Sequence, residues 1–334
     1  MISIFIYAFI LSFLSNIFII FLSKKYHIFL DDSNTDKPQG FHTIPTPRAG
    51  GIGILIGVLL LILSPFGIQF ILSTLFAFAS GIFEDLHNSL SPKLRLVLQI
   101  IAATSAILLT DAVVTYLGLG ITLPYWAGVI FSIFAITGMM NAINIIDGFN
   151  GLASGVILLI LASFAIIAYQ HDNSVILYSV SIIAGSTFGF FILNFPKGKI
   201  FLGDGGAYML GFIVSIVGIF LASKYANVSP WYVMAIFIYP VWEVIFSITR
   251  KLSIGLSPME PDSRHMHMLI HKHITKSNPL TALFILLSLL PSMILSTLFS
   301  YSSKYNIVIA FFFIVGYLFL YFYLHRKENR LEVS

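Results

Sequence analysis

The chain has 334 residues, of which 58% are hydrophobic and only 10% are charged, and its mean hydropathy is +0.95. Soluble globular domains carry about 25% charged residues, so this composition excludes a soluble domain, and it excludes a disordered chain because disorder requires low hydrophobicity. The absence of cysteine excludes disulfides, thiolate metal sites and cysteine nucleophiles. The net charge of +4 is informative about orientation in a membrane rather than about nucleic-acid binding.

Apolar runs of helical length follow one another along the chain. A membrane span needs about 20 mainly apolar residues. The first run is not a cleavable signal, because Lys24 and Lys25 stand where a small-residue cleavage site would be expected. We expect a single all-α domain over residues 1–334, a polytopic integral membrane protein. Its eleven spans are expected near residues 3–23, 50–64, 68–82, 94–110, 125–140, 151–169, 174–193, 206–222, 231–249, 280–299 and 305–324.

The basic residues orient these spans. With the N-terminus outside, all of the 18 basic residues except Lys224 and Lys304 fall on the cytoplasmic side. This bias predicts an N-terminus outside and a C-terminus in the cytoplasm. Most of the polar residues fall on the same side, so we expect the active site to be cytoplasmic. The segments expected to form it are 24–49, 83–93, 141–150, 194–205 and 250–279.

The first polar segment, residues 36–51, reads DKPQGFHTIPTPRAGG. Its prolines prevent a continuous helix, His42 and Arg48 offer hydrogen-bond donors, and Gly50 and Gly51 allow close approach of a ligand or a helix. An ordinary polar loop leading into the second span is the structural alternative.

The second polar segment contains the adjacent carboxylates Glu84 and Asp85, followed by Lys93 and Arg95. A carboxylate pair at a helix end can bind a metal or accept a proton, and neighbouring negative charges raise one of the two pKa values. A solvated acidic helix end that pairs with the two basic residues is the alternative.

The third segment, residues 141–152, reads NAINIIDGFNGL. Asn141, Asn144 and Asp147 recur every three residues, so in a helix they share one side, and oxygen-bearing side chains suit a hard cation such as Mg²⁺. A helix end with Asn and Gly turn residues explains the glycines but not the three stacked polar side chains.

The fourth segment, residues 197–206, reads KGKIFLGDGG. Backbone N–H groups at the following helix N-terminus attract phosphate. Asp204 is expected to cap that helix or to bind a metal.

The fifth segment, residues 261–273, holds four histidines within nine residues. His267 and His271 have the spacing of a helical zinc pair, but no Glu lies between them and the flanking basic residues repel a cation. Arg264, His265 and His267 fit phosphate binding better. Nearby, Glu243 lies inside a predicted span, which makes it a functional candidate, with a buried partner for a basic residue as the alternative.

Together these segments resemble one family, the polyprenyl-phosphate N-acetylhexosamine-1-phosphate transferases. Residues 141–152 read as the family's Asn-x-x-Asn-x-x-Asp-Gly-x-x-Gly-Leu, residues 201–205 match its Gly-Asp turn, and residues 42–51 match its His…Pro-x-Pro-Arg-x-Gly-Gly segment. Three positions depart from the usual pattern: Glu84 replaces an Asp, Met268 replaces a His, and Gly206 stands where Ser is usual. The Glu-Asp pair and the His-x-His-Met run are similar to the branch that initiates O-antigen or surface polysaccharide, and they argue against the peptidoglycan member.

The resemblance implies transfer of N-acetylhexosamine-1-phosphate from a UDP-N-acetylhexosamine to undecaprenyl phosphate, with release of UMP, as a first membrane step of envelope glycan synthesis. It implies Mg²⁺ as cofactor, with Mn²⁺ as a substitute. It also implies that the protein lies in the bacterial inner membrane. Membrane lipid is an expected partner and nucleic acid is not, and a homodimer is left open. A lipid acceptor and a water-soluble donor must meet at the membrane interface, where a metal can neutralise the pyrophosphate.

The resemblance also assigns roles to residues. Asn144 and Asp204 are expected to bind the metal. Glu84 or Asp85 is expected to bind or deprotonate the lipid phosphate, and Asp147 to support the metal or the nucleotide. We therefore assign catalytic roles to Glu84, Asp85, Asp147, His265 and His267. Substrate binding is assigned to His42, Arg48, Lys93, Arg95, Asn141 and Arg264.

Three other classes are compatible with parts of the sequence. A secondary transporter would place polar groups near the membrane midplane, often in internal repeats, whereas here they gather on one side and no repeat is evident. A zinc-dependent intramembrane hydrolase would retain stoichiometric zinc after purification. A membrane scaffold would not need five polar segments on one face.

Overall fold

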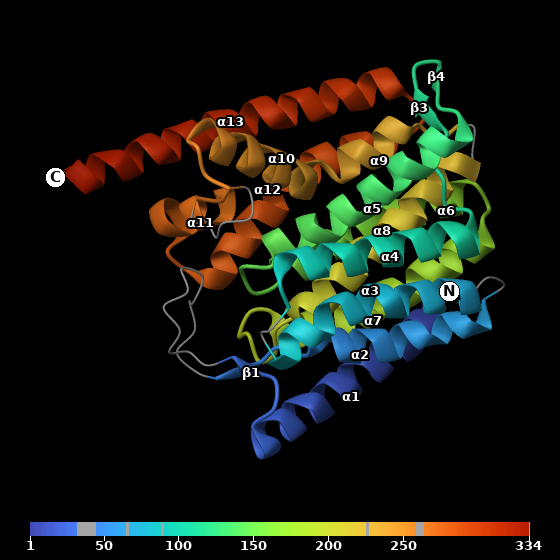
Figure 1. Cartoon of the computed structure of the whole chain (residues 1–334), viewed down its shortest axis with the longest axis horizontal. Helices are drawn as coiled ribbons and strands as arrows, with labels where there is room; N and C mark the ends of the chain where they lie inside the picture. The colour runs from blue at the N-terminus through green and yellow to red at the C-terminus, as the bar shows by residue number, and fades with distance from the viewer. Residues whose placement is uncertain (32–44, 65–66, 88–89, 225–226, 258–263, 334) are drawn as a thin grey trace.

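The computed structural model describes residues 1–31, 45–64, 67–87, 90–224, 227–257 and 264–333 (Figure 1). These residues form long helices with two short antiparallel hairpins, which confirms an all-α polytopic fold. The long helices are α1 (Ile2–Tyr26), α3 (Gly67–His87), α4 (Pro92–Thr110), α5 (Tyr125–Ile146), α6 (Leu152–Gln170), α7 (Ser174–Asn194), α8 (Gly203–Lys224), α10 (Ile238–Ser253), α12 (Asn278–Leu298) and α13 (Ser303–Val333). The shorter elements are α2 (Gly50–Val58), η1 (Leu59–Leu63), α9 (Pro230–Ile236), α11 (Met266–Ile270), η2 (His271–Thr275), β1 (Leu30–Asp31), β2 (Thr46–Pro47), β3 (Tyr116–Gly118) and β4 (Ile121–Thr122).

Each of the eleven predicted spans coincides with a helix or a helix pair. Among the described residues, nine helices are long and apolar enough to cross a membrane, and a tenth span results if α9 and α10, which meet at 74°, count as one. The remaining predicted span corresponds to the shorter apolar stretch Gly50–Leu63. The number of spans and the orientation of the termini stay predictions.

Local sequence signals explain where several helices begin. Ser91 accepts a hydrogen bond from the backbone N–H of Leu94 and is followed by proline, and Ser229 starts α9 in the same way. The side chain of Asn173 caps α7 through the N–H of Ile176. Such caps satisfy N–H groups that lack an intrahelical partner, so these helices start at fixed residues.

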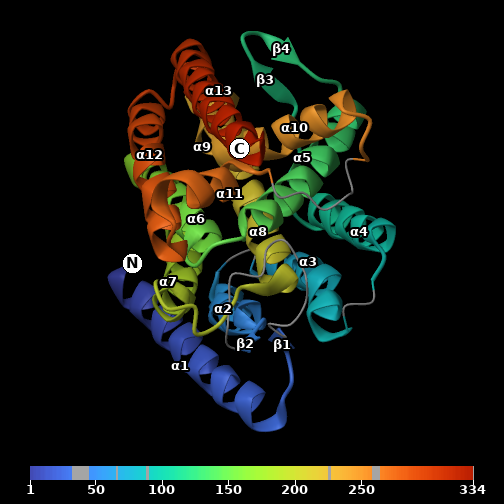
Figure 2. The same cartoon turned by 90° about the vertical axis from the view of Figure 1, so that its left-hand side faces the viewer.

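The helix α8 occupies the centre of the bundle, as the end-on view shows (Figure 2). In its most apolar 18-residue window 89% of the residues are buried, compared with 28% for α1 and 22% for α13, which lie at the periphery. The N-terminal end of α8 is therefore surrounded by the ends of other helices, and this end carries Asp204.

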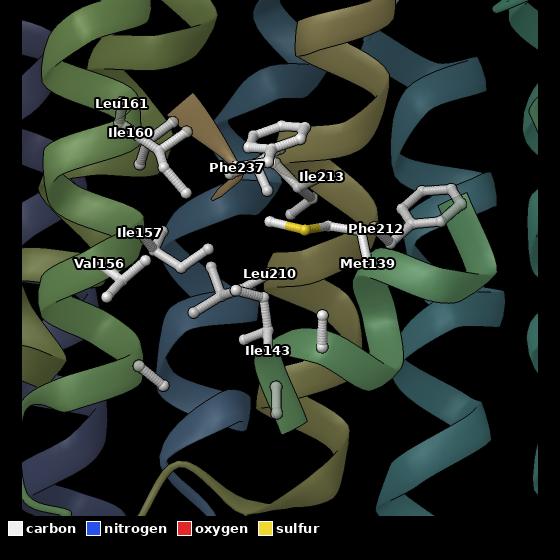
Figure 3. Close-up of a cluster of buried hydrophobic side chains, with 14 of the residues drawn as sticks. Met139, Ile143, Val156, Ile157, Ile160, Leu161, Leu210, Phe212, Ile213 and Phe237 are labelled. Atoms are coloured by element: carbon white, nitrogen blue, oxygen red, sulfur yellow. The ribbon is translucent and has the colours of Figure 1, made fainter. Parts of the chain in front are cut away.

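Large apolar side chains fill the space between α5, α6 and α8 (Figure 3). Ile143, Ile157 and Ile213 are fully buried in this cluster. On the other side of α8, contact with α2 requires glycine, because a Cβ on Gly51 would lie 2.5 Å from the Cα of Gly206. Close backbone approach of this kind is typical of helix packing in membranes.

The structure corrects several boundaries of the predicted polar segments. Helix α3 continues to His87 and α5 continues to Ile146, so Glu84, Asp85 and the two asparagines of the third segment lie on helix ends rather than in loops. The fifth segment includes two short helices, α11 and η2. Helix α13 extends beyond its predicted end, past the rest of the bundle (Figure 1).

Candidate active site

Asp204, in the first turn of α8, is the side chain on which several helix ends converge. Arg95 Nη1, from α4, donates a hydrogen bond to Asp204 Oδ2 over 3.0 Å, and Arg48 Nη2, which precedes α2, lies 3.5 Å from Oδ1. Asn144 Nδ2, from the end of α5, donates to Oδ1 over 3.0 Å. Two guanidinium groups therefore face one largely buried carboxylate, and positive charge is concentrated where phosphate groups could approach.

Asp85, at the end of α3, caps α8 from outside that helix. Its Oδ1 accepts the backbone N–H of Asp204 and its Oδ2 accepts that of Gly205, each over 2.9 Å. Gly203 has φ +76, and a Cβ there would lie 2.7 Å from Asp85 Oδ2, so glycine is needed for this contact. We expected Asp204 itself to cap α8 or to bind a metal; the capping carboxylate is that of Asp85.

The chain before α2 pairs with the chain before α8 and thereby places Arg48. The N–H groups of Gly50 and Gly51 donate to the carbonyls of Phe201 and Leu202 over 2.9 and 3.0 Å. In return, the N–H of Phe201 donates to Pro47 over 2.8 Å. The two glycine-containing segments, at Gly50 and Gly51 and at the start of α8, therefore lie side by side.

The three predicted polar residues of the third segment lie at the end of α5 and have different surroundings. Asn141 Nδ2 donates to Gln99 Oε1 of α4 over 2.6 Å and to the carbonyl of Thr137 over 2.8 Å, so its side chain takes part in a contact between helices. The helix ends at Ile146, and Asp147 has φ −78 and ψ 51. Asp147 is therefore the C-cap residue of α5, at which the chain leaves the helix. That it shares one side with Asn141 and Asn144 stays a prediction.

Asp147 lies beyond the span and is partly buried. Removal of water raises the pKa of its carboxyl from 3.8 to about 7, the charge of Asp204 adds to the rise, and Arg48 opposes it. A carboxyl with a pKa near neutrality can hold or release a proton under the conditions of the cell.

Two histidines of the fifth segment lie buried next to the same turn. His265 Nδ1 lies 3.0 Å from Glu243 Oε1, and the rings of His265 and His267 stack at 5.4 Å between centroids. Among the described residues, neither ring nitrogen of His267 has a hydrogen-bond partner. Burial lowers the pKa of His267 to about 4, so this ring is neutral at pH 7.

His267 joins the histidine segment to the turn that follows α5. A Cβ on Gly148 would lie 3.3 Å from His267 Nε2. The ring of Phe149 contacts both His267 and His271, with centroid distances of 5.7 and 5.1 Å. The arginine–aspartate cluster and the histidines therefore belong to one continuous region.

The other predicted site residues lie around this region or beyond it. Glu84 is partly buried and accepts the N–H of Leu90 over 3.0 Å. Lys93 is exposed at the start of α4, and Arg264 is partly exposed before α11. His42 lies outside the described residues. Met268, which stands where the family usually has His, is buried.

Three contributors to this region were missed or only partly recognised in the sequence. Gln99 pairs with Asn141, and Asn194 Oδ1 accepts the N–H of Gly151 over 2.6 Å. Tyr317 donates to Glu243 over 3.0 Å. Their only signal is a polar side chain within an apolar run, which identifies a buried hydrogen bond but not its partner.

The predicted Mg²⁺ ligands Asn144 and Asp204 do lie together. Proteins usually bind Mg²⁺ through one or two carboxylates together with water and substrate phosphates. In the part of the chain that the structure describes, no three His, Asp or Glu side chains form a cluster able to hold a metal. The residues present fit a Mg²⁺ ion bound jointly by the protein and a phosphate substrate.

Comparison with known proteins agrees with this geometry. The glycosyl transferase family 4 profile matches residues 68–222, which include α3, α4, α5 and the start of α8. A probable undecaprenyl-phosphate N-acetylglucosaminyl 1-phosphate transferase of Bacillus subtilis is 29% identical over 275 residues, covering 78% of this chain and 75% of the relative. An undecaprenyl-phosphate alpha-N-acetylglucosaminyl 1-phosphate transferase of Thermotoga maritima is 27% identical over 271 residues, covering 80% and 81%.

A phospho-N-acetylmuramoyl-pentapeptide-transferase of Lactobacillus gasseri is 36% identical over 145 residues, which cover 42% of this chain and 44% of the relative. These matches support the resemblance of the chain to the polyprenyl-phosphate N-acetylhexosamine-1-phosphate transferase superfamily. The resemblance seen in the sequence is thereby confirmed at the level of this superfamily of glycosyl-1-phosphate transferases. Its relatives include both N-acetylglucosaminyl and muramoyl-pentapeptide transferases, so the branch stays a prediction.

Proposed function

We propose that this transferase moves N-acetylhexosamine-1-phosphate from a UDP-N-acetylhexosamine to undecaprenyl phosphate and releases UMP. The reaction takes place at the cytoplasmic face of a bacterial inner membrane. It starts the synthesis of O-antigen or another surface polysaccharide.

One observation carries this proposal: Arg48, Arg95 and Asn144, from three separate helix ends, converge on Asp204. This reaction brings together two phosphate-bearing substrates, which repel each other. Paired guanidinium groups bind phosphate oxygens and offset that repulsion. The convergence of donors at one end of the bundle also fits a lipid acceptor whose headgroup remains at the interface.

The chemistry is a phosphoryl transfer between two oxygens. An oxygen of the lipid phosphate attacks the β-phosphorus of the UDP-sugar, and the bond from that phosphorus to the bridging oxygen breaks, so that UMP leaves with the electron pair. Mg²⁺, when bound through Asn144 and Asp204, neutralises the pyrophosphate and stabilises the leaving group. The protein supplies position and charge. Arg48 and Arg95 hold phosphate oxygens, and Asp147 accepts or holds a proton near neutral pH.

The structure gives no specific support to the transporter alternative. Glu243, an acid inside a predicted span, has both of its oxygens occupied by donors from the protein. It is therefore not an open carboxylate along a pathway.

The test is lipid-dependent UMP release by the purified protein, measured with undecaprenyl phosphate, Mg²⁺ and a panel of UDP-N-acetylhexosamines. We expect release with at least one sugar, and its loss in Asp204→Asn. Asp111→Asn is the matched control, because Asp111 bonds Tyr125 near the opposite end of the bundle. Its left-handed backbone (φ 53) suits asparagine. Full Mg²⁺-dependent activity in Asp204→Asn would overturn the metal assignment, and no release with any sugar from folded protein would overturn the reaction.

A further inference from the structure

Glu243 of α10 is the most deeply buried acid near the site, with 1% of its surface exposed. Three groups lie within hydrogen-bonding distance of its carboxylate. His265 Nδ1 and the backbone N–H of Met266 lie 3.0 Å from Oε1, and the hydroxyl of Tyr317 lies 3.0 Å from Oε2. A buried carboxylate is costly unless it is fully hydrogen-bonded, and this one is.

These contacts define which nitrogen of His265 carries the proton. An ionised carboxylate only accepts hydrogen bonds, so Nδ1 of the ring must donate to it, and Nε2 is left for a ligand. The neighbouring N–H of Met266 binds the same oxygen, which fixes the backbone at the start of α11 as well. The carboxylate therefore sets both the tautomer and the orientation of this ring.

The C-terminal helix α13 contributes to the same arrangement. Besides Tyr317, Lys327 Nζ reaches the carbonyl of His273 over 3.4 Å, and Glu328 Oε1 accepts from Lys272 Nζ over 2.6 Å. The histidine segment is thus attached to α10 and α13, both far from it in sequence. Figure 2 shows α11 next to α13 at the end of the bundle that faces the viewer.

We propose that Glu243, oriented by Tyr317, is a positioning residue that holds His265 with a proton on Nδ1, so that Nε2 can accept the proton of a substrate phosphate and then donate a hydrogen bond to its oxygen. The step from positioning to catalysis rests on the proposed function. The positioning itself is a statement about the free protein and can be measured without substrate.

The first measurement is nitrogen NMR of the protein labelled with ¹⁵N in the histidine rings, at pH 8, with His265→Gln used to assign the signals. We expect the proton of His265 on Nδ1 in the wild type, and a loss or change of that signature in Glu243→Gln. A wild-type ring protonated on Nε2, or an unchanged His265 signal in Glu243→Gln, would overturn the proposal.

The second measurement is steady-state UMP release. Groups that orient a functional histidine through a hydrogen bond to its other ring nitrogen change activity by roughly 10- to 100-fold when they are removed, so we expect such a fall in kcat for Glu243→Gln with little change in KM. Tyr317→Phe removes one hydroxyl and keeps the ring, so a fall of about 3- to 10-fold is expected. Tyr317→Phe also keeps the proposal testable if Glu243→Gln does not fold.

Tyr321→Phe is the matched control. Tyr321 lies one turn further along α13 with its ring stacked on that of Tyr317, and its hydroxyl has no hydrogen-bond partner within the described ranges. We expect kcat to stay within about twofold of the wild type, because no hydrogen bond is lost. Equal losses in Tyr317→Phe and Tyr321→Phe would overturn the positioning role. A wild type that releases no UMP would contradict the proposed function, while the NMR result would still decide the positioning.

Discussion

His267 differs from its neighbour His265 because its buried ring has no hydrogen-bond partner among the described residues. Its ring is fully buried, and neither nitrogen has a hydrogen-bond partner among the described residues. A neutral imidazole tolerates this environment far better than a charged one. The ring next to it, His265, instead has a carboxylate partner. Two histidines that are one residue apart in the sequence therefore have opposite electrostatic environments.

The depressed pKa of His267 predicts a pH dependence of stability. Well above pH 6.5 the ring is neutral in both the folded and the unfolded chain, so it does not make the stability depend on pH there. As the pH falls from 6.5 to about 4, the unfolded chain binds a proton that the folded chain excludes, so the folded state loses on the order of 1 kcal/mol of stability per pH unit.

The measurement is the apparent unfolding temperature in detergent between pH 8 and pH 4. His267→Gln lacks the titrating group, so its unfolding temperature should fall less steeply than that of the wild type over this range. Parallel curves for the two proteins would show that His267 does not take up a proton on unfolding in this window.

At the scale of elements, the site is assembled from helix ends. The starts of α4 and α8 and the end of α5 contribute Arg95, Asp204 and Asn144, and the end of α3 contributes Asp85. The N-terminus of a helix has unsatisfied N–H groups, and at α8 two of them are bonded by Asp85. The placement of Asp204 therefore depends on a carboxylate from another helix.

This arrangement predicts different consequences for the two aspartates. Asp85→Asn keeps one acceptor oxygen but turns an NH₂ group toward the second N–H of α8, so we expect a loss of roughly 1–3 kcal/mol in stability together with lower activity. Asp204→Asn removes the negative charge that faces two guanidinium groups, but these side chains are 26% and 24% exposed and water can solvate them, so we expect a smaller loss of stability, while activity is lost.

Unfolding temperature and UMP release, measured for both variants, separate the two roles. The expected result is that Asp85→Asn has the lower unfolding temperature of the two. An Asp85→Asn protein with the stability of the wild type but no activity would instead indicate that Asp85 acts directly on the substrate.

At the scale of the whole molecule, the two termini lie at opposite ends of the bundle (Figure 1). The site lies at the end where the C-terminus is found, next to α11 and the start of α8. This arrangement agrees with the odd number of crossings that the distribution of basic residues predicts. It also places the site at the end of the bundle that the distribution of basic residues predicts to be cytoplasmic.

The absence of cysteine makes this topology directly testable. We predict that an impermeant maleimide added to intact cells labels Lys304→Cys, and that it labels Lys199→Cys only after the membrane is permeabilised. Both native lysines are exposed, so the two variants form a matched pair. The reverse pattern would contradict the orientation given by the positive-inside rule.

The sequence by itself determined which segments are helices and which residues gather at the site. An apolar run in lipid must satisfy its backbone hydrogen bonds internally, so hydropathy alone predicts a helix over each run. The family resemblance carried by the polar motifs assigned Asn144 and Asp204 to one metal site, and the two side chains do lie together. The sequence could not predict that α5 ends at Ile146, so that Asp147 is the residue at which the chain leaves the helix.

Only the tertiary structure decided which side chains pair. Asp85 caps a helix 119 residues further along the chain, Asn141 bonds Gln99 of α4, and Glu243 joins α10 to α11 and α13. A helix in a membrane is apolar on nearly all sides, so its hydropathy does not define which side faces which neighbour. Rotation and depth follow from close packing at small residues such as Gly51 and Gly206, and these contacts exist only in the assembled bundle.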